Sequence, residues 1–266
     1  MITIISLLFS AAYLFSMLYF VSHTVWYLIL IWAVTSILVF YIISGIQIVG
    51  FSILIMPFLK QESKFKYFFV RSLARWLAFF LFYLTIKVEG RENVPLEGKL
   101  TIYANHKSKI DPAFVTVAVR RAHGYAAKSD LRKYPVTKQI VEGVNSFYVY
   151  RQDNRATLKE LLRGIKNAKD GFAHVIFPEG GTMHRDHEDI TAVRTGAFKL
   201  VEKAETDILP VTILGSNRRG RKKRFFFVPA QVKVIVHKPI KFEEVANLDT
   251  SQIADKVIDI INSPFN

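Results

Sequence analysis

A histidine and an aspartate five residues apart are the strongest candidates for catalysis in this sequence. His106 follows a candidate strand, and Asp111 precedes Pro112, a residue that favours the first position of a helix. A carboxylate beside an imidazole fixes its tautomer and stabilises the imidazolium that forms during proton transfer. The pair could therefore deprotonate a hydroxyl group. Taken alone, a capping aspartate and a turn histidine are the more frequent explanation, because short motifs have many false positives.

Two other segments could bind a phosphate group. Residues 177–182 read Phe-Pro-Glu-Gly-Gly-Thr and follow a candidate strand, where glycines let backbone amides approach a phosphate or hydroxyl ligand. Arg151 ends another candidate strand, where a guanidinium at the carboxyl edge of a parallel sheet suits bidentate phosphate binding. The ordinary alternatives are a strand-to-loop turn and a surface salt bridge.

The elements that would position these residues alternate between strand and helix. We expect strands at 85–89, 99–104, 124–128, 147–151, 173–177, 208–214 and 231–237, and helices at 112–121, 136–142, 155–168, 195–204 and 251–262. The third of these helices repeats apolar residues with a 3.6-residue period, which predicts one buried face made of Leu158, Leu161, Leu162, Ile165 and Ala168. The pattern predicts an α/β domain at 87–266, with a mostly parallel central sheet flanked by helices.

The N-terminal region predicts a transmembrane helical hairpin. Residues 1–59 contain no Asp, Glu, Lys or Arg, and a span needs about 20 apolar residues, so this stretch suits two spans. We place them at 2–21 and 25–43, with a polar break at 22–24 and an apolar extension to Leu59. A cleaved signal peptide is disfavoured because residues 2–20 lack a basic start. Residues 60–86 predict a basic, aromatic interfacial helix, with a third span as the alternative.

The charges suggest where the protein resides and what it meets. The net charge is +14, and every charged residue follows residue 59. Basic residues just after the second span favour the cytoplasmic side, so we expect an integral protein of the cell membrane with its large domain on the cytoplasmic face. The basic run 218–224 would then meet anionic lipid or phosphate, or be a solvated hairpin tip, and nucleic acid is not an expected partner. The polar loop 183–189 is expected to be solvated, and we predict no metal site. The absence of cysteine excludes disulfides and thiolate nucleophiles.

Four motifs in order resemble those of the glycerolipid acyltransferase superfamily, in particular its 1-acylglycerol-3-phosphate acyltransferases. The matching residues are Asn105, His106 and Asp111 for the first motif, Arg151 for the second, Phe177, Pro178, Glu179 and Gly180 for the third, and Leu209, Pro210 and Val211 for the fourth. Lesser similarities lie at Gly90, Glu92, Asn93, Pro95, Lys128, Arg194, Gly196 and Ala197. The resemblance extends from about Val88 to Ile240. It departs from the family after Gly180, where Gly181 stands before Thr182 and the next arginine is Arg185.

The resemblance implies a reaction and a site. His106, oriented by Asp111, would take the proton of the sn-2 hydroxyl of 1-acylglycerol-3-phosphate, which would attack an acyl thioester directly. Arg151 would hold the acceptor phosphate, with Lys128 and Arg194 as further phosphate contacts and Asn105, Glu179 and Gly180 lining the acceptor site. Acyl-CoA or acyl-[acyl carrier protein] would be the co-substrate, without a bound cofactor. Glycerol-3-phosphate or another lysophospholipid is the alternative acceptor, and a non-catalytic membrane-anchored lipid- or nucleic-acid-binding protein is the alternative of another class.

Overall fold

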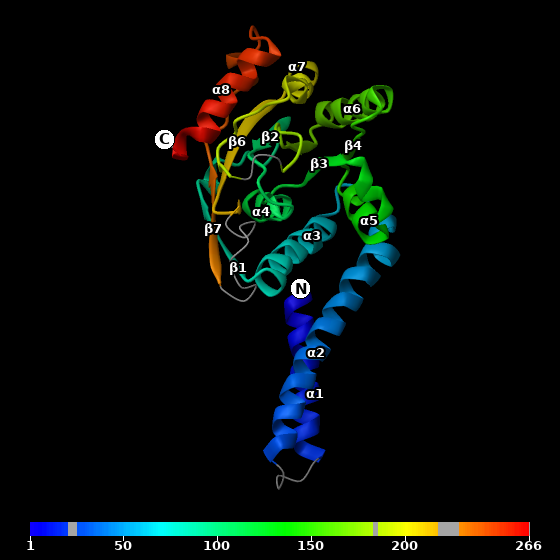
Figure 1. Cartoon of the computed structure of the whole chain (residues 1–266). Coiled ribbons are helices and arrows are strands. Elements are labelled where there is room, and N and C mark those ends of the chain that lie inside the picture. Colours follow the sequence, from blue (N-terminus) through cyan, green and yellow to red (C-terminus); the bar gives the residue numbers. More distant parts are fainter. Residues whose placement is uncertain (21–25, 183–185, 218–228, 266) are drawn as a thin grey trace.

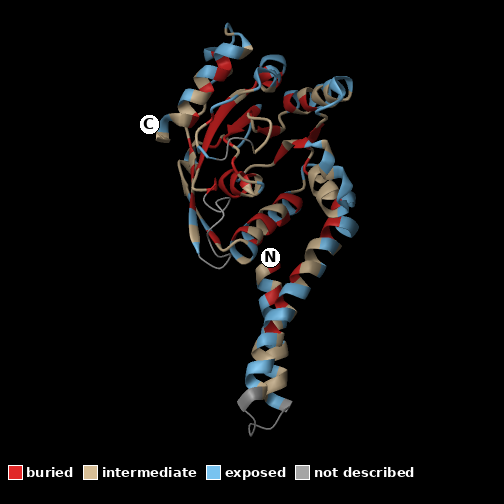
Figure 2. Ribbon diagram, viewed as in Figure 1, coloured by how far each residue is buried: buried red, intermediate tan, exposed pale blue. Residues whose placement is uncertain are grey.

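A helical hairpin projects from an α/β domain (Figure 1). The computed structural model describes residues 1–265 except 21–25, 183–185 and 218–228. The polar break at 22–24, the first three residues of the polar loop 183–189 and the basic run 218–224 therefore lie outside the described residues. Buried residues concentrate on the sheet and on the helix faces against it, whereas exposed residues follow the hairpin (Figure 2).

The domain is built on one seven-stranded sheet, in the order β1-β7-β6-β2-β5-β3-β4. Every neighbouring pair is parallel except β6 and β7, which are antiparallel. This confirms the predicted mostly parallel sheet, and all seven predicted strands occur within two residues of their expected bounds. They are β1 (Leu84–Glu89), β2 (Leu100–Ala104), β3 (His123–Lys128), β4 (Phe147–Val149), β5 (Ala173–Ile176), β6 (Asp207–Leu214) and β7 (Ala230–Val236).

Helices cover both faces of the sheet. On one face, α4 (Asp111–Ala118) packs its Phe114 and Val115 against strand residues such as Ile102 and Val211. The other face meets α6 (Asn154–Lys169), α7 (Lys199–Ala204) and α8 (Thr250–Asn262). The predicted helix at 195–204 is split, because a 3-10 turn (Thr195–Phe198) precedes α7. The remaining predicted helix is α5 (Pro135–Gly143).

The predicted buried face of α6 is wrong in part. Leu158 and Leu162 are 56% and 58% exposed, whereas Gly164 and Ala168 are buried. A Cβ at Gly164 would lie 2.7 Å from the Phe147 ring, so the helix approaches the sheet through its smallest residues. Because Gly164 and Ala168 face the sheet, Leu158 and Leu162 point toward solvent, although the periodicity alone predicts that they are buried.

The hairpin consists of α1 (Ile2–Phe20) and α2 (Trp26–Gly50), joined by a buried hydrogen bond between Ser44 and Ser6. By length and composition both helices could cross a membrane. The predicted end of the second span at Ile43 is wrong, because α2 runs to Gly50 and continues through a π-helical turn (Phe51–Ile55) and a 3-10 turn (Met56–Phe58). A glycine inside a helix costs about 1 kcal/mol of stability relative to alanine. Ending the helix in an apolar environment would leave backbone N–H and C=O groups unpaired, at a cost of several kcal/mol each, so the helix continues through Gly45.

The basic, aromatic segment forms α3 (Lys64–Trp76), which is capped by Ser63 and followed by a π-helical turn (Leu77–Leu81). Its aromatic residues are divided, since Tyr67 and Phe69 are buried while Phe65 and Phe68 are about half exposed. β1 already begins at Leu84, so the helix is shorter than predicted. Within the described residues only the two hairpin helices are long and apolar enough to span a membrane, which gives the third-span alternative no support.

Candidate active site

The site lies where the two central strands β2 and β5 end. Tyr103 of β2 pairs with Ile176 of β5, so the loops that follow both strands leave the sheet side by side at its carboxyl edge. All five residues of β2 are buried, which fixes the position of the chain just before His106. Open parallel sheets bind their ligands at this edge, and the fold therefore brings the first and third sequence motifs together.

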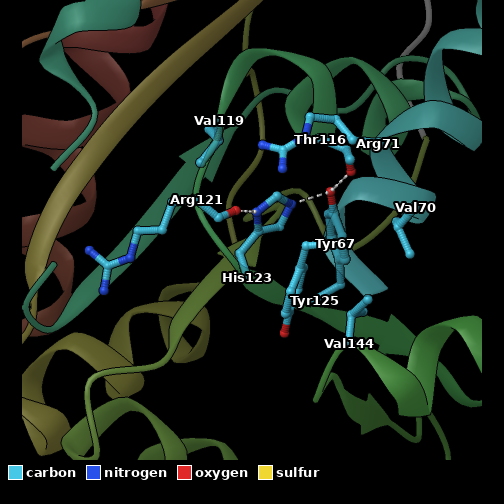
Figure 3. Close-up of a pocket in the computed structure, with 9 residues that line it drawn as sticks. All are labelled: Tyr67, Val70, Arg71, Thr116, Val119, Arg121, His123, Tyr125 and Val144. Atoms are coloured by element: carbon cyan, nitrogen blue, oxygen red, sulfur yellow. Dashed lines mark hydrogen bonds between the residues drawn. The ribbon is translucent and has the colours of Figure 1, made fainter. Parts of the chain in front are cut away.

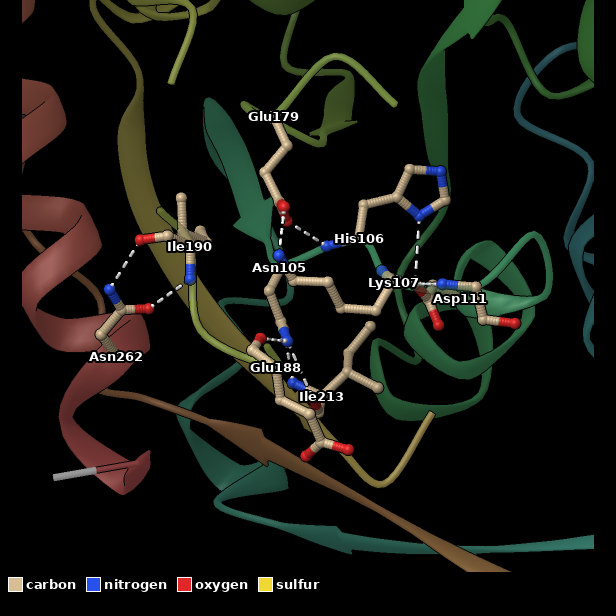
Figure 4. A network of polar contacts seen from close by, with 10 residues as sticks. Asn105, His106, Lys107, Asp111, Glu179, Glu188, Ile190, Ile213 and Asn262 are labelled. Carbon is tan, nitrogen blue, oxygen red and sulfur yellow. Dashed lines mark hydrogen bonds and ion pairs between the residues drawn. The ribbon is translucent and has the colours of Figure 1, made fainter. Parts of the chain in front are cut away.

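His106 and Asp111 are in direct contact. Asp111 is the first residue of α4 and is fully buried, and its Oδ2 atom lies 3.1 Å from His106 Nδ1 (Figure 4). The same oxygen accepts the backbone N–H groups of Lys107 and Ser108, each at 2.7 Å. A carboxylate held in this way requires Nδ1 to carry the proton, so Nε2 presents its lone pair. The His106 side chain is 16% exposed, which leaves it accessible to a substrate hydroxyl.

The imidazole is also fixed from the third-motif loop. The ring of Phe177 stacks on His106 with centroids 4.2 Å apart and an interplanar angle of 24°. Asp111 holds the ring edge, and Phe177 covers one ring face. The imidazole is therefore held in a single orientation.

A buried ion pair beside the histidine was not foreseen from the sequence. Lys107 Nζ pairs with Glu179 Oε2, and Glu179 Oε1 accepts the backbone N–H of His106 at 2.6 Å. The two side chains are 0% and 4% exposed. Burial raises the pKa of Glu179, against the lowering effect of the Lys107 and His106 donors. Glu179, expected to line the acceptor site, thus directs its carboxylate into the protein.

Asn105 is likewise turned inward. Its Oδ1 accepts the N–H of Ile213 at 2.7 Å, and its Nδ2 donates to the carbonyls of Ile213 and Glu188 at 2.8 and 2.9 Å. The residue is fully buried, so the geometry does not support the expected substrate contact. Instead, the Asn105 side chain connects the end of β2 by hydrogen bonds to β6 and to the loop before α7 (Figure 4). Glu188 belongs to the polar loop 183–189 that was expected to be solvated, but it is only partly exposed and its carboxylate accepts the N–H of Gly215, so the expectation is wrong at this residue.

Three predicted residues meet at Gly180. Arg151 donates to the Gly180 carbonyl, and a Cβ on Gly180 would lie 2.6 Å from Arg194 Nε. Gly180 has φ of +69°, a conformation that favours glycine. Both arginines are exposed, and neither forms an ion pair in the part of the chain that the structure describes. Two guanidiniums beside one loop, without a carboxylate partner among the described residues, suit a phosphate group.

Lys128 differs from these two arginines in having a carboxylate partner. It ends β3 with a half-exposed side chain that pairs with Asp130. Hydrogen bonding to Lys128 lowers the pKa of Asp130, and the charge of Arg151 contributes a smaller lowering. Among the described residues, no group of three His, Asp or Glu side chains is arranged to hold a metal ion.

Comparison with known proteins finds similarity to acyltransferases. The Acyltransferase family model matches residues 85–214. A 1-acyl-sn-glycerol-3-phosphate acyltransferase of Borreliella burgdorferi is 27% identical over 179 residues, 66% of this chain and 71% of that protein. A probable 1-acyl-sn-glycerol-3-phosphate acyltransferase of Mycoplasma pneumoniae is 27% identical over 197 residues, 69% of this chain and 73% of that protein.

The fold is also that of a solved relative. The crystal structure of the 1-acyl-sn-glycerophosphate acyltransferase from Thermotoga maritima superposes with a TM-score of 0.68 over 84% of this chain and 90% of that one, at 22% identity. The family match spans the loops that carry His106, Asp111 and Glu179. Residues 85–214 thus form an Acyltransferase-family domain, and the chain is an O-acyltransferase.

Proposed function

We propose that the protein transfers a fatty acyl group from an acyl thioester to the sn-2 hydroxyl of 1-acylglycerol-3-phosphate, making phosphatidic acid for phospholipid synthesis. The observation that carries the chemistry is the buried Asp111 carboxylate bound to Nδ1 of the partly exposed His106. The acceptor assignment is supported by the relatives that bear this activity in their names and by the two arginines at Gly180, neither of which has a carboxylate partner among the described residues.

The residues would act in one direct transfer. His106 Nε2 takes the proton of the sn-2 hydroxyl while the hydroxyl oxygen attacks the carbonyl carbon of the thioester. The tetrahedral intermediate then collapses, the carbon–sulfur bond breaks, and the imidazolium returns the proton to the leaving thiolate. Asp111 stabilises the imidazolium throughout. General-base help of this kind is worth about 10²–10⁴ in rate. No acyl-enzyme on sulfur is possible because the chain has no cysteine.

The neighbouring residues would divide into two groups. Lys107, Glu179 and Asn105 act as positioning residues. Glu179 accepts the N–H of His106 and pairs with Lys107, and Asn105 bonds the end of β2 to Ile213 of β6. Arg151 and Arg194 would hold the acceptor phosphate beside Gly180. Lys128 could join them only by releasing Asp130, to which it is paired.

The proposed location is the cell membrane, with the hairpin inserted and the catalytic domain on the cytoplasmic face. Both hairpin helices expose large apolar side chains, among them Leu8, Phe15, Ile31 and Ile42. Lys60 and Lys64 follow α2 closely, as expected for a cytoplasmic boundary. The acyl donor is proposed to be acyl-CoA or acyl-[acyl carrier protein], and acyl chains would enter from the bilayer.

A comparison of acceptors tests the assignment. Purified protein is supplied with one acyl thioester and with lysophosphatidate, glycerol-3-phosphate or lysophosphatidylcholine. We expect the highest kcat/KM with lysophosphatidate, and we expect Arg151→Gln to raise its KM about tenfold or more by removing a charge-assisted phosphate contact. Arg155→Gln is the matched control, since Arg155 is exposed and lies four residues away on α6. Faster transfer to glycerol-3-phosphate would reassign the acceptor, and no transfer to any acceptor would refute the proposal.

A further inference from the structure

Four arginines without acidic partners lie near the junction of the hairpin and the catalytic domain. Arg71 and Arg75 lie one turn apart in α3, Arg91 opens the turn after β1, and Arg120 follows α4. Within the described residues, none of their side chains forms a hydrogen bond or an ion pair. Elsewhere in the domain, cations such as Lys107, Lys233 and Lys241 do have carboxylate partners. These four arginines therefore form an uncompensated positive group.

The elements that carry the four arginines are in contact, since α3 packs against α4 and Arg121, next to Arg120, donates to the carbonyls of Pro95 and Glu97 in the segment that follows Arg91. Burial lowers the pKa of Arg71, and the charges of Arg75 and Arg120 lower it further. Burial also lowers the pKa of Arg91, as do Arg120, Arg75 and Arg71 in that order. Arg71 in addition lines a small cavity beside α3, together with Tyr67, Arg121 and His123 (Figure 3). Partly desolvated, mutually repelling cations form a surface that favours an anion.

The position of the group indicates which anion. The N–H of Ile2 donates to Ser72 Oγ at 3.3 Å, so the first turn of the apolar helix α1 lies against α3 (Figure 1). Ser72 directly follows Arg71 and precedes Arg75 in α3. Phe65, Phe68 and Phe79 are about half exposed on and just after the same helix. Half-exposed aromatic rings and arginines at the end of apolar helices are typical of the headgroup level of a bilayer.

We propose that Arg71, Arg75, Arg91 and Arg120 bind the phosphate group of an anionic phospholipid in the leaflet that meets the catalytic domain. The planar guanidinium fork matches phosphate oxygens, and the bound charge relieves the repulsion among the arginines. The site lies against the apolar hairpin, which favours a lipid headgroup over free phosphate. The inference rests on the proposed insertion of the hairpin into a membrane but not on acyl transfer, so it can fail or hold independently of the catalytic assignment.

Thermal unfolding of the purified full chain tests the site. The protein is held in nonionic micelles, to which phosphatidylglycerol, phosphatidylcholine or inorganic phosphate is added at equal concentration. The variant R71Q/R75Q/R91Q/R120Q is compared with R155Q/K159Q/K166Q/K169Q, which removes the same charge from α6. Those four cations have no ion-pair partner among the described residues and lie on the opposite side of the domain from the hairpin (Figure 1).

We expect phosphatidylglycerol to raise the unfolding midpoint of the wild type and of the α6 control by about 3–6 °C, and phosphatidylcholine to leave it unchanged. The quadruple arginine variant should lose this shift. In neutral micelles it should unfold no earlier than the wild type, because the substitution removes repulsion. An equal shift in both variants, or loss of the shift in both, would overturn the site. An equal shift with inorganic phosphate would overturn the assignment to lipid. Acyl transfer measured in parallel reports separately on the proposed function.

Discussion

Replacing Lys107 by methionine removes one partner of the buried ion pair beside His106. Methionine is close to lysine in length, so the change removes the charge with little loss of packing. Glu179 would remain 4% exposed with its carboxylate opposite an apolar group. Removing one partner of a buried pair typically costs about 3–5 kcal/mol, because the remaining charge stays buried. The solvent screening that weakens surface pairs does not apply here.

The stability lost in Lys107→Met should increase as pH rises. Burial already raises the pKa of Glu179, and loss of Lys107 removes the main opposing charge, so the pKa rises further. A group whose folded pKa lies above its unfolded value destabilises the fold as pH rises through that folded pKa, by about 1.4 kcal/mol per unit. The deficit of Lys107→Met relative to wild type should therefore be smallest near pH 5 and should grow toward pH 8.

Chemical unfolding at pH 5, 6.5 and 8 measures this deficit. Lys109→Met is the matched control, since Lys109 is exposed in the same loop and has no ion-pair partner among the described residues. It should change the free energy of unfolding by about 0.5 kcal/mol or less. A double-mutant cycle with Glu179→Gln should show that the two losses are not additive. If Lys107→Met destabilises the protein no more than Lys109→Met does, or equally at every pH, the reasoning about the buried pair is refuted.

Two other predictions follow from the backbone and from a buried histidine. Gly180→Ala should raise the acceptor KM about tenfold with a smaller effect on kcat, because its Cβ would lie 2.6 Å from Arg194 Nε at a φ of +69°. Gly171→Ala is the control: its φ is +88° and nothing lies within 4 Å of the added Cβ, so the backbone strain should cost about 1–2 kcal/mol of stability, as at Gly180, without changing KM. An equal KM in both variants would contradict this prediction. Burial lowers the pKa of His123 from 6.5 to about 4, so the unfolded chain takes up a proton first as pH falls, and stability should decline by about 3 kcal/mol between pH 6.5 and 4 on account of this residue. Unfolding of His123→Gln across that range should show a shallower decline, and an unchanged slope would contradict the assignment.

The sequence predicts what local patterns and chain order determine. Strand positions follow from short runs of β-branched and aromatic residues, and the proximity of His106 to Asp111 follows from a strand end meeting a helix start five residues later. The order of the four motifs indicated the superfamily, which the comparisons confirm. The catalytic roles of His106 and Asp111 stay predictions until they are measured.

Other features depend on contacts between distant residues. Lys107 meets Glu179 only because β2 pairs with β5, and nothing near Lys107 in the sequence specifies this register. Asn105 resembled a substrate contact because it precedes the histidine, but its partners lie on β6 and in the loop before α7. The rotation of α6, set by Gly164 against Phe147, is likewise a matter of fit between surfaces that periodicity does not describe.

The most direct test of the proposed mechanism is acyl transfer from a labelled acyl thioester to lysophosphatidate by the wild type and by His106→Ala, in the same detergent. The His106 side chain is partly exposed, so the variant should fold, and an unchanged unfolding transition would establish this. General-base catalysis by the His106–Asp111 pair predicts that the wild type transfers the acyl group and that the variant loses about a hundredfold or more in kcat. Equal rates in the two proteins would contradict it.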